Sequence, residues 1–281
     1  MRCILDESFL KKHVPVRKRD TSKLDYGKAF ILSGSAVYTG APYFAAMGAV
    51  KSGAGLVYLG LPKAIHGILA VKLNEPIIIP FADHDGALDS GSILQILDKE
   101  KTMSACLFGP GVGLGAHIRQ IVCGLVLEGS APLVLDADGI NALKGNIDII
   151  KRAGRPVVLT PHAGEFARIA PDFAAMPDKE RAAADFAKEY GCVLVLKGSQ
   201  TITALSDGDL FVNQTGNPGM AKGGSGDVLA GLITGLIAQG FAPGIAAGLA
   251  TYIHGRAGDR AAQIYGEYSA APTNLLEQIR I

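Results

Sequence analysis

Residues 28–59 read KAFILSGSAVYTGAPYFAAMGAVKSGAGLVYL, and this stretch decides the fold of the chain. It opens with a short apolar run from Lys28 to Ser33, which ends in a Gly-Ser loop as a buried strand does. Residues 40–50 then favour a helix, and residues 56–59 favour a second strand. Strand, helix and strand in this order form a βαβ unit, which implies a parallel sheet. The stretch therefore predicts an α/β fold.

The same alternation continues along the chain. Further short apolar runs predict strands at residues 77–79, 105–108, 133–135, 157–159 and 193–196. Most of these runs carry no charge on either face, as is usual when helices cover both sides of a sheet. Residues 116–127 and 178–190 are typical of the intervening helices, and we expect Gly191 to cap the second one.

Residues 201–205 and 210–212 flank Asp207-Gly208 and predict an antiparallel hairpin at the edge of the sheet. No linker or low-complexity segment divides the chain. We therefore expect one domain over residues 1–281, with a mostly parallel central sheet in a three-layer α/β arrangement.

The composition is typical of a folded enzyme, because 48% of the 281 residues are hydrophobic and 19% are charged. A net charge of +1 gives no argument for a nucleic-acid or membrane partner, and we expect neither. The four cysteines form no CxxC pair, which indicates free thiols in a reducing compartment. The N-terminus lacks the apolar core of a signal peptide, so we expect a cytoplasmic protein.

The stretch 228–253 contains no charged residue and is long enough to span a bilayer. Turn-forming residues interrupt it at 239–244, where the sequence is QGFAPG. Two buried helices of about a dozen residues each fit this pattern better than one membrane span.

Several of the predicted strands end in loops rich in glycine or polar residues. These loops are Gly34-Ser35, Gly109–Gly113, Asp136–Asp138, Thr160–Glu165 and Lys197–Ser199. In open parallel sheets, ligands bind beyond the carboxyl ends of the strands. We therefore expect the loops to meet in one cleft.

The segment NPGMAKGGSGD at residues 217–227 carries the clearest chemical signal. Its glycines leave backbone N–H groups free to face an anion, and the apolar run that follows predicts a helix whose start attracts negative charge. We expect an anion hole made by Gly223, Gly224, Ser225 and Gly226. Asp227 lies at the junction, where it is well placed to take a proton from a hydroxyl group that attacks phosphorus. The segment indicates phosphoryl transfer.

Other motifs leave two interpretations open. The GPGVG loop at 109–113 is either part of the site or only a tight turn. Asp136 and Asp138 follow a strand, and we expect one of them to cap the next helix while the other could lie near metal or phosphate. Lys197 could be a surface lysine, although its continuation GSQT favours a contact with nucleotide phosphate or ribose.

His162 and Glu165 have a spacing that could suit a metal pair, but no second His or Cys lies at ligand spacing. We interpret His162 as a substrate contact and Glu165 as an acid in the first turn of a helix. No GxxxxGK[ST] motif occurs, which excludes a P-loop NTPase, and the lack of GxSxG weakens an α/β-hydrolase. The sequence assigns no metal ligands.

Seven segments occur together and in a characteristic order: Gly34–Ala41, Lys51–Val57, Gly109–Gly113, Leu135–Asp138, Leu159–Glu165, Val195–Gly198 and Asn217–Asp227. In this combination the chain resembles the ADP/ATP-dependent NAD(P)H-hydrate dehydratases of the ribokinase-like superfamily. The resemblance implies a ribokinase-like three-layer α/β/α sandwich and a hydro-lyase activity. Such an enzyme phosphorylates the ring hydroxyl of (6S)-NADHX or NADPHX and eliminates phosphate, which restores NADH or NADPH. The co-substrate is ADP, which gives AMP and phosphate, or ATP, and we expect ADP here.

The resemblance also implies roles for single residues. Ala41, Gly111 and His162 would contact the hydrate. The adenine nucleotide would be lined by Lys197, Gly198, Ser199, Gln200, Thr201 and Gly226. Asp227 would activate the ring hydroxyl and touch the substrate. Mg²⁺ is expected to accompany the nucleotide, and relatives lead us to expect a homotetramer.

Two rival interpretations remain open at this point. A kinase of the hydroxyethylthiazole or hydroxymethylpyrimidine type would share the GGSGD element, although TPHAGE at 160–165 favours the dehydratase. A non-catalytic nucleotide sensor is disfavoured because Asp227 and its neighbouring glycines are retained. Bacterial relatives often carry an N-terminal epimerase domain, and we expect this chain, which is too short for one, to consist of the dehydratase domain alone.

Overall fold

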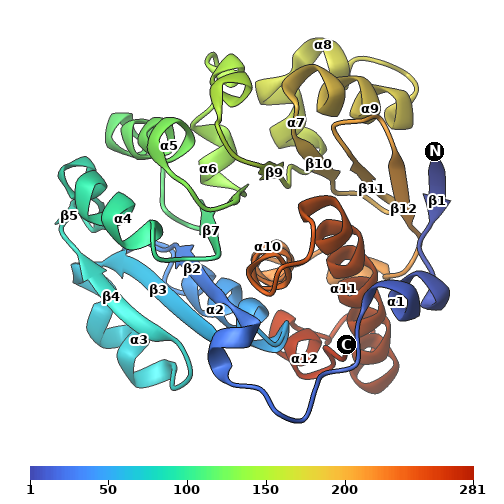
Figure 1. Cartoon of the computed structure of the whole chain (residues 1–281), viewed down its shortest axis with the longest axis horizontal. Coiled ribbons are helices and arrows are strands. Elements are labelled where there is room, and N and C mark those ends of the chain that lie inside the picture. The colour runs from blue at the N-terminus through green and yellow to red at the C-terminus, as the bar shows by residue number, and fades with distance from the viewer.

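The computed structural model describes residues 1–281 and contains the predicted βαβ unit (Figure 1). Strands β2 (Lys28–Leu32) and β3 (Leu56–Pro62) pair in parallel, and helix α2 (Ala41–Lys51) connects them. Pro42 lies in the first turn of α2, where its missing N–H group costs no helical hydrogen bond. The prediction from residues 28–59 is confirmed.

Ten strands form the central sheet, in the order β1-β12-β11-β10-β9-β8-β7-β2-β3-β4. All neighbours are parallel except β11, which is antiparallel to both β10 and β12. The other strands of this sheet are β1 (Arg2–Ile4), β4 (Ile77–Phe81), β7 (Ala105–Phe108), β8 (Leu133–Leu135), β9 (Val157–Leu159), β10 (Val193–Leu196), β11 (Thr201–Ala204) and β12 (Leu210–Asn213). A separate small hairpin pairs β5 (Asp83–His84) with β6 (Ala87–Leu88). The mostly parallel sheet confirms the predicted fold class.

The hairpin of β11 and β12 is antiparallel as predicted, but its predicted place at the edge of the sheet is wrong. Strand β1 pairs in parallel with β12 and is itself the outermost strand. Because β1 has only three residues and both Arg2 and Ile4 are exposed, no apolar run marks it in the sequence.

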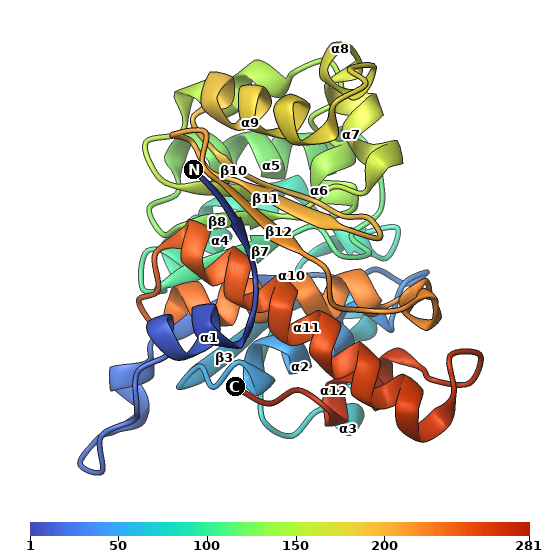
Figure 2. The same ribbon diagram turned by 90° about the vertical axis from the view of Figure 1, so that its right-hand side faces the viewer.

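Helices cover both faces of the sheet and complete the three layers (Figure 2). One face carries α2 with α1 (Glu7–His13), α3 (His66–Lys72), α10 (Ser225–Ala238), α11 (Pro243–Tyr265) and α12 (Pro272–Glu277). The other face carries α4 (Ile93–Glu100), α5 (Ala116–Glu128), α6 (Asp138–Asn141), α7 (Ala163–Ile169), α8 (Pro171–Ala174) and α9 (Lys179–Tyr190). Each layer of helices shares one large apolar cluster with the sheet, because the strand residues alternate between the two faces.

The uncharged stretch 228–253 folds into parts of two helices, as the interruption at 239–244 predicts. Helix α10 ends at Ala238 and α11 begins at Pro243. Nearly every residue of α10 is buried, which explains why its sequence is apolar on all sides. None of the helices combines the length and the apolar character that crossing a bilayer requires.

All four cysteines are free thiols, as the sequence indicates. Cys106 and Cys192 are buried, and burial raises the pKa of each thiol to about 12. A thiol with so high a pKa is a poor nucleophile at neutral pH, so these two side chains serve packing.

Candidate active site

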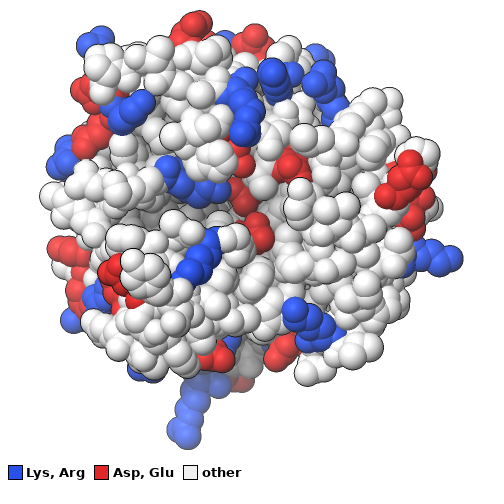
Figure 3. All heavy atoms as spheres, turned by 180° about the vertical axis from the view of Figure 1, so that it is seen from behind, with Lys and Arg blue, Asp and Glu red and all other residues white.

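A cavity of about 830 Å³ lies beside the start of α10 and is lined by residues of the predicted loops. Its walls come from the loop after β10, the segment between β12 and α10, and the middle of α11. Seen from the side opposite to Figure 1, acidic side chains lie near the centre of the surface with basic side chains next to them (Figure 3). Of the predicted nucleotide-binding residues, the cavity is lined by Lys197, Gly198, Ser199, Thr201 and Gly226. Gln200 is exposed and lies outside this lining.

Lys197 lines the cavity but does not point freely toward a ligand. Its Nζ donates to Oδ1 of Asp136 over 2.8 Å, and Thr160 Oγ1 donates to the same oxygen over 2.6 Å. Burial by itself lowers the pKa of Lys197, but the carboxylates of Asp136, Glu165 and Asp227 outweigh it and raise the pKa above its usual value. Lys197 is therefore a fixed positive charge on the cavity wall.

Asp227 is the carboxylate left free by this arrangement, since its side chain makes no hydrogen bond within the protein. Its pKa is raised to about 7, mainly by burial and then by the negative charge of Asp136. Lys197 opposes this rise, and Asp138 and Glu165 add to it. An unpaired carboxylate that titrates near neutral pH meets the requirements of a general base.

The start of α10 presents unpaired backbone donors, as the anion-hole prediction requires. Gly224 is the N-cap with φ of +100°, and no side chain caps the helix. The N–H groups of Gly223, Gly224, Gly226 and Asp227 have no acceptor in the protein. The N–H of Ser225 donates to the carbonyl of Lys222 over 3.2 Å. Three of the four predicted anion-hole residues therefore offer a free N–H, and Ser225 does not.

Two side chains fix the loop that leads into α10. Lys222 lines the cavity, but its Nζ donates to the carbonyls of Glu267, Tyr268 and Ala270. On the other flank, Asp259 of α11 accepts from the N–H of Gly216 and from Nδ2 of Asn217, both over 3.0 Å. A lysine next to a glycine-rich loop would suggest a phosphate contact, but here its hydrogen bonds hold the loop against residues 267–270.

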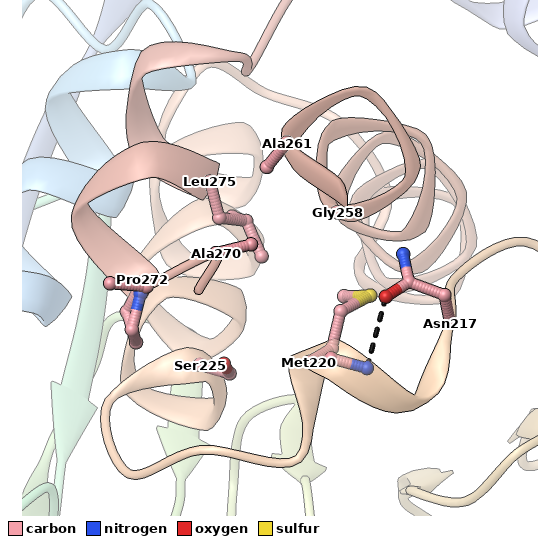
Figure 4. Close-up of a pocket in the computed structure, with 10 residues that line it drawn as sticks. Asn217, Met220, Ser225, Gly258, Ala261, Ala270, Pro272 and Leu275 are labelled. Atoms are coloured by element: carbon pink, nitrogen blue, oxygen red, sulfur yellow. Dashed lines mark hydrogen bonds between the residues drawn. The ribbon is translucent and has the colours of Figure 1, made fainter. Parts of the chain in front are cut away.

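A much smaller cavity lies beneath the same loop, between α11 and α12 (Figure 4). Asn217 Oδ1 accepts from the N–H of Gly219 over 3.0 Å at its rim. Met220 packs there against Gly258, where a Cβ would lie 2.2 Å from the Met220 sulfur. The space is about 10 Å³, enough for about one water molecule. It is a gap in the packing of the loop rather than a ligand site.

His162 and Glu165 form the N-terminal cap of α7. His162 Nδ1 accepts from the N–H groups of Gly164 and Glu165, while Glu165 Oε2 accepts from the His162 N–H over 2.9 Å. The prediction that Glu165 is a first-turn acid is confirmed. The His162 side chain is 54% exposed and borders the cavity, and its Nε2 lies 3.5 Å from Oε1 of Glu165.

Ala41 and Gly111 lie next to each other and do not line the large cavity. Gly111 has φ of +63°, and a Cβ there would lie 2.8 Å from Cβ of Ala41 and 2.7 Å from Cβ of Tyr38. The ring of Phe44 packs against Gly224 and so joins this part of α2 to the start of α10. Helix α2, which begins at Ala41, is thus in contact with the start of α10 through Phe44.

The prediction that Asp136 or Asp138 caps α6 is wrong. The N-cap is Ala137, which has no side-chain oxygen and adopts φ of +49°. Asp138 Oδ2 instead accepts from the N–H of Gly113 over 2.9 Å, and so supports the GPGVG loop. Since Asp136 holds Lys197, the two carboxylates support opposite sides of the site.

Four residues that line the cavity were not predicted from the sequence. Asn213, Thr215, Thr251 and His254 line its inner wall and come from β12, the loop after it and α11. Of these four residues, only His254 could have been singled out from the sequence, because it is an ionisable residue directly after the uncharged run 228–253.

The comparison with known proteins identifies the family. A family model described as NAD(P)H-hydrate dehydratase matches residues 29–280. The chain belongs to this family. That assignment favours the dehydratase interpretation over the related small-molecule kinases.

Members of this family are similar to the chain over most of its length. The bifunctional NAD(P)H-hydrate repair enzyme Nnr of Moorella thermoacetica is 38% identical over 98% of this chain and 53% of its own length. The chain thus spans about half the length of the bifunctional relatives it matches. The ADP-dependent (S)-NAD(P)H-hydrate dehydratase of Bacillus subtilis is 32% identical over 97% of this chain and 93% of its own.

A solved structure supports the ribokinase-like fold assignment. The ADP/ATP-dependent NAD(P)H-hydrate dehydratase of Bacillus subtilis, co-crystallised with ATP and Mg²⁺, superposes with a TM-score of 0.84. The two chains are 30% identical, and the match covers 99% of this chain and 96% of the other.

The acidic residues near Asp227 do not form a ready metal site. No group of three or more His, Cys, Asp or Glu side chains is placed to hold an ion. Asp136 is engaged by Lys197 and Thr160, and Glu165 is engaged by the α7 cap. Mg²⁺ usually keeps several waters and binds through substrate phosphates, so these residues do not suit an ion held by the protein alone.

Proposed function

We propose that the protein is an ADP-dependent (S)-NAD(P)H-hydrate dehydratase, which converts (6S)-NADHX and NADPHX to NADH and NADPH. The observation that carries the proposal is Asp227, an unpaired carboxylate with a pKa of about 7 beside the open N–H groups of α10. Family membership supplies the substrate, and the name of the Bacillus subtilis relative supplies the nucleotide.

The chemistry requires a base and an anion site together. In this proposal Asp227 takes the proton of the ring hydroxyl, and the oxygen attacks the terminal phosphorus of ADP. The bond from that phosphorus to the bridging oxygen breaks, and AMP leaves. The lone pair of the ring nitrogen then expels phosphate, and loss of a proton from the neighbouring carbon restores the double bond. The N–H groups of Gly223, Gly224 and Gly226 would stabilise negative charge on the transferred group.

In this proposal the nucleotide and the hydrate bind on two sides of Asp227. The nucleotide side would consist of Lys197, Gly198, Ser199, Gln200, Thr201 and Gly226, and the hydrate side of Ala41, Gly111 and His162. In support, the first set mostly lines the 830 Å³ cavity, and Ala41 and Gly111 adjoin each other beyond it. We further propose that Mg²⁺ enters with the nucleotide, that residues 1–281 act as one domain, and that the protein is a homotetramer.

The proposal is tested by adding NADHX, ADP and Mg²⁺ to the purified protein and following absorbance at 340 nm together with AMP release. We expect absorbance to recover with AMP formed in equal amount. A parallel assay with ATP decides the nucleotide. If neither nucleotide restores absorbance but hydroxyethylthiazole is phosphorylated, the rival kinase function is correct. Nucleotide binding without any turnover would instead support a sensor.

A further inference from the structure

His254 is a buried histidine on the inner wall of the large cavity. It lies in α11, one turn after Thr251, and only 8% of its surface is exposed. Its Nε2 lies 2.9 Å from the carbonyl oxygen of Ser225, in the first turn of α10. A carbonyl can only accept a hydrogen bond, so Nε2 must carry a proton and donate it.

The other ring nitrogen is therefore an acceptor. Burial lowers the pKa of His254 to about 4, which keeps the ring neutral at physiological pH. With the proton on Nε2, a neutral ring leaves a lone pair on Nδ1. Nδ1 has no hydrogen-bond partner in the protein and is not among the enclosed polar atoms. The bond to Ser225 fixes the direction of this free acceptor.

Several other polar groups of the cavity are hydrogen-bond donors. The N–H groups of Gly223, Gly224 and Gly226 are donors without partners, and Lys197 is a cation. Asn213 and Thr215 use their side-chain atoms on each other and on nearby carbonyls.

An acceptor without a partner would repel phosphate oxygens, and a ligand that covered it without donating a hydrogen bond would bind more weakly. The partner of Nδ1 should therefore be an uncharged hydrogen-bond donor on the nucleoside part of the ligand. Leu229 and the backbone of Gly255 line the same cavity and offer apolar surface to a flat ring. The 6-amino group of adenine fits these conditions, and a ribose hydroxyl is the other donor that an adenine nucleotide carries.

We propose that Nδ1 of His254 accepts a hydrogen bond from the 6-amino group of the bound adenine nucleotide and thereby selects the base. The inference rests on the proposed use of an adenine nucleotide. Inosine nucleotides carry a carbonyl oxygen in place of the 6-amino group, so they would face Nδ1 with a second acceptor and bind more weakly.

Two variants separate the ring nitrogens. In His254→Gln, the amide nitrogen can still donate to Ser225, but the acceptor at the Nδ1 position is lost. In His254→Asn, the side-chain oxygen retains an acceptor near that position. Thermal melting of both variants shows whether the fold is kept. If His254→Gln does not fold, the proposal is tested by NMR on wild-type protein labelled with ¹⁵N at the histidine rings. In that sample the resonance of His254 Nδ1 moves upfield when ADP is added if the proposal is correct, and stays unchanged if it is not.

The main measurement is the Kd of ADP, IDP, 2′-deoxy-ADP and 3′-deoxy-ADP by calorimetry, which needs no turnover. We expect wild type to favour ADP over IDP by about tenfold or more, the ratio in His254→Gln to fall toward one, and His254→Asn to keep part of it. If the weaker binding of the deoxy analogues disappears in His254→Gln instead, the donor is a ribose hydroxyl, and selection of the base by His254 is overturned. An equal loss for all four nucleotides would overturn the inference while leaving the proposed function intact. Failure of wild type to bind any of them would overturn both.

Discussion

The Nζ atom of Lys197 lies 2.8 Å from Oδ1 of Asp136, and this pair joins the ends of two neighbouring regions of the sheet. Asp136 follows β8 and Lys197 follows β10, while Thr160 after β9 donates to the same carboxylate. Asp136 is almost completely buried, so its charge acts on the surroundings with little screening by water. Both Lys197 and Asp227 therefore titrate under its influence.

Replacing Asp136 by asparagine should shift the pH profile of the reaction. Asp227 must lose its proton to act as a base, and the negative charge of Asp136 is the second cause of its raised pKa, after burial. In Asp136→Asn the pKa of Asp227 falls, so the acid limb of log kcat/KM against pH moves down by about one unit. Asp148→Asn, which changes an exposed carboxylate far from the site, is the control. An unmoved acid limb would show that Asp227 does not govern it.

Asp227→Asn should abolish catalysis without abolishing nucleotide binding. The amide cannot accept the hydroxyl proton, so we expect kcat to fall by about 10²–10⁴-fold. The side chain makes no hydrogen bond in the protein, so the loop should keep its shape and the Kd of ADP should change only a few-fold. Rapid-quench turnover and calorimetry measure the two effects. A variant that stays active would exclude Asp227 as the base.

The same substitution should stabilise the protein at high pH. Asp227 has a pKa of about 7 in the folded state, against about 3.9 in an unfolded chain. A raised folded pKa means that stability is fully present below pH 4 and is lost as pH rises toward 7 and beyond. Asp227→Asn removes this loss, so the free energy of unfolding at pH 8 should rise by roughly 2 kcal/mol, given partial exposure of the side chain. Urea unfolding at pH 4 and pH 8 checks this, and equal effects at both pH values would contradict it.

Gly224→Ala should damage the anion site more than backbone strain alone explains. Gly224 has φ of +100°, and a Cβ there would lie 2.7 Å from the ring of Phe44. Gly208 has φ of +91°, and a Cβ there would have no atom within 4 Å, so Gly208→Ala carries only the left-handed strain of about 1–2 kcal/mol. We expect Gly224→Ala to lower Tm further than this control and to weaken ADP binding at least about tenfold. Equal Tm losses with unchanged binding would argue against a role for this backbone.

Lys222→Met should act on nucleotide affinity rather than on the chemical step. The substitution removes three hydrogen bonds to the carbonyls of Glu267, Tyr268 and Ala270, which hold the loop beside the cavity. We expect the KM for ADP to rise about tenfold while kcat changes less than about threefold. Lys179→Met is the matched control, because Lys179 also donates to a backbone carbonyl but lies away from the cavity. A large loss of kcat with unchanged KM would assign Lys222 to the reaction itself.

The repeating elements of the fold could be predicted because each is recorded locally in the sequence. Apolar runs such as 105–108 and 133–135 match β7 and β8 residue for residue. Strand β1 could not be found this way, because three residues, two of them exposed, leave no pattern and only the partner β12 makes them a strand. The buried ion pair of Arg155 and Glu100 is also absent from any local pattern, since it joins residues far apart in the chain.

For the site, the sequence could predict residue types but not their partners. The glycines before α10 and Asp227 stand in one continuous segment, so their proximity was predictable. The pairing of Lys197 with Asp136 and the turning of Lys222 toward the 267–270 loop depend on tertiary packing. The roles of Ala41, Gly111 and His162 stay predictions.

Ala137 stands between the two carboxylates in a conformation that alanine rarely adopts, with φ of +49°. This single residue separates Asp136, which holds Lys197, from Asp138, which holds the loop at Gly113. A ligand that displaces either carboxylate must strain this residue, so the two halves of the site should be thermodynamically linked. By reciprocity, whatever factor ADP applies to hydrate affinity, the hydrate must apply to ADP affinity.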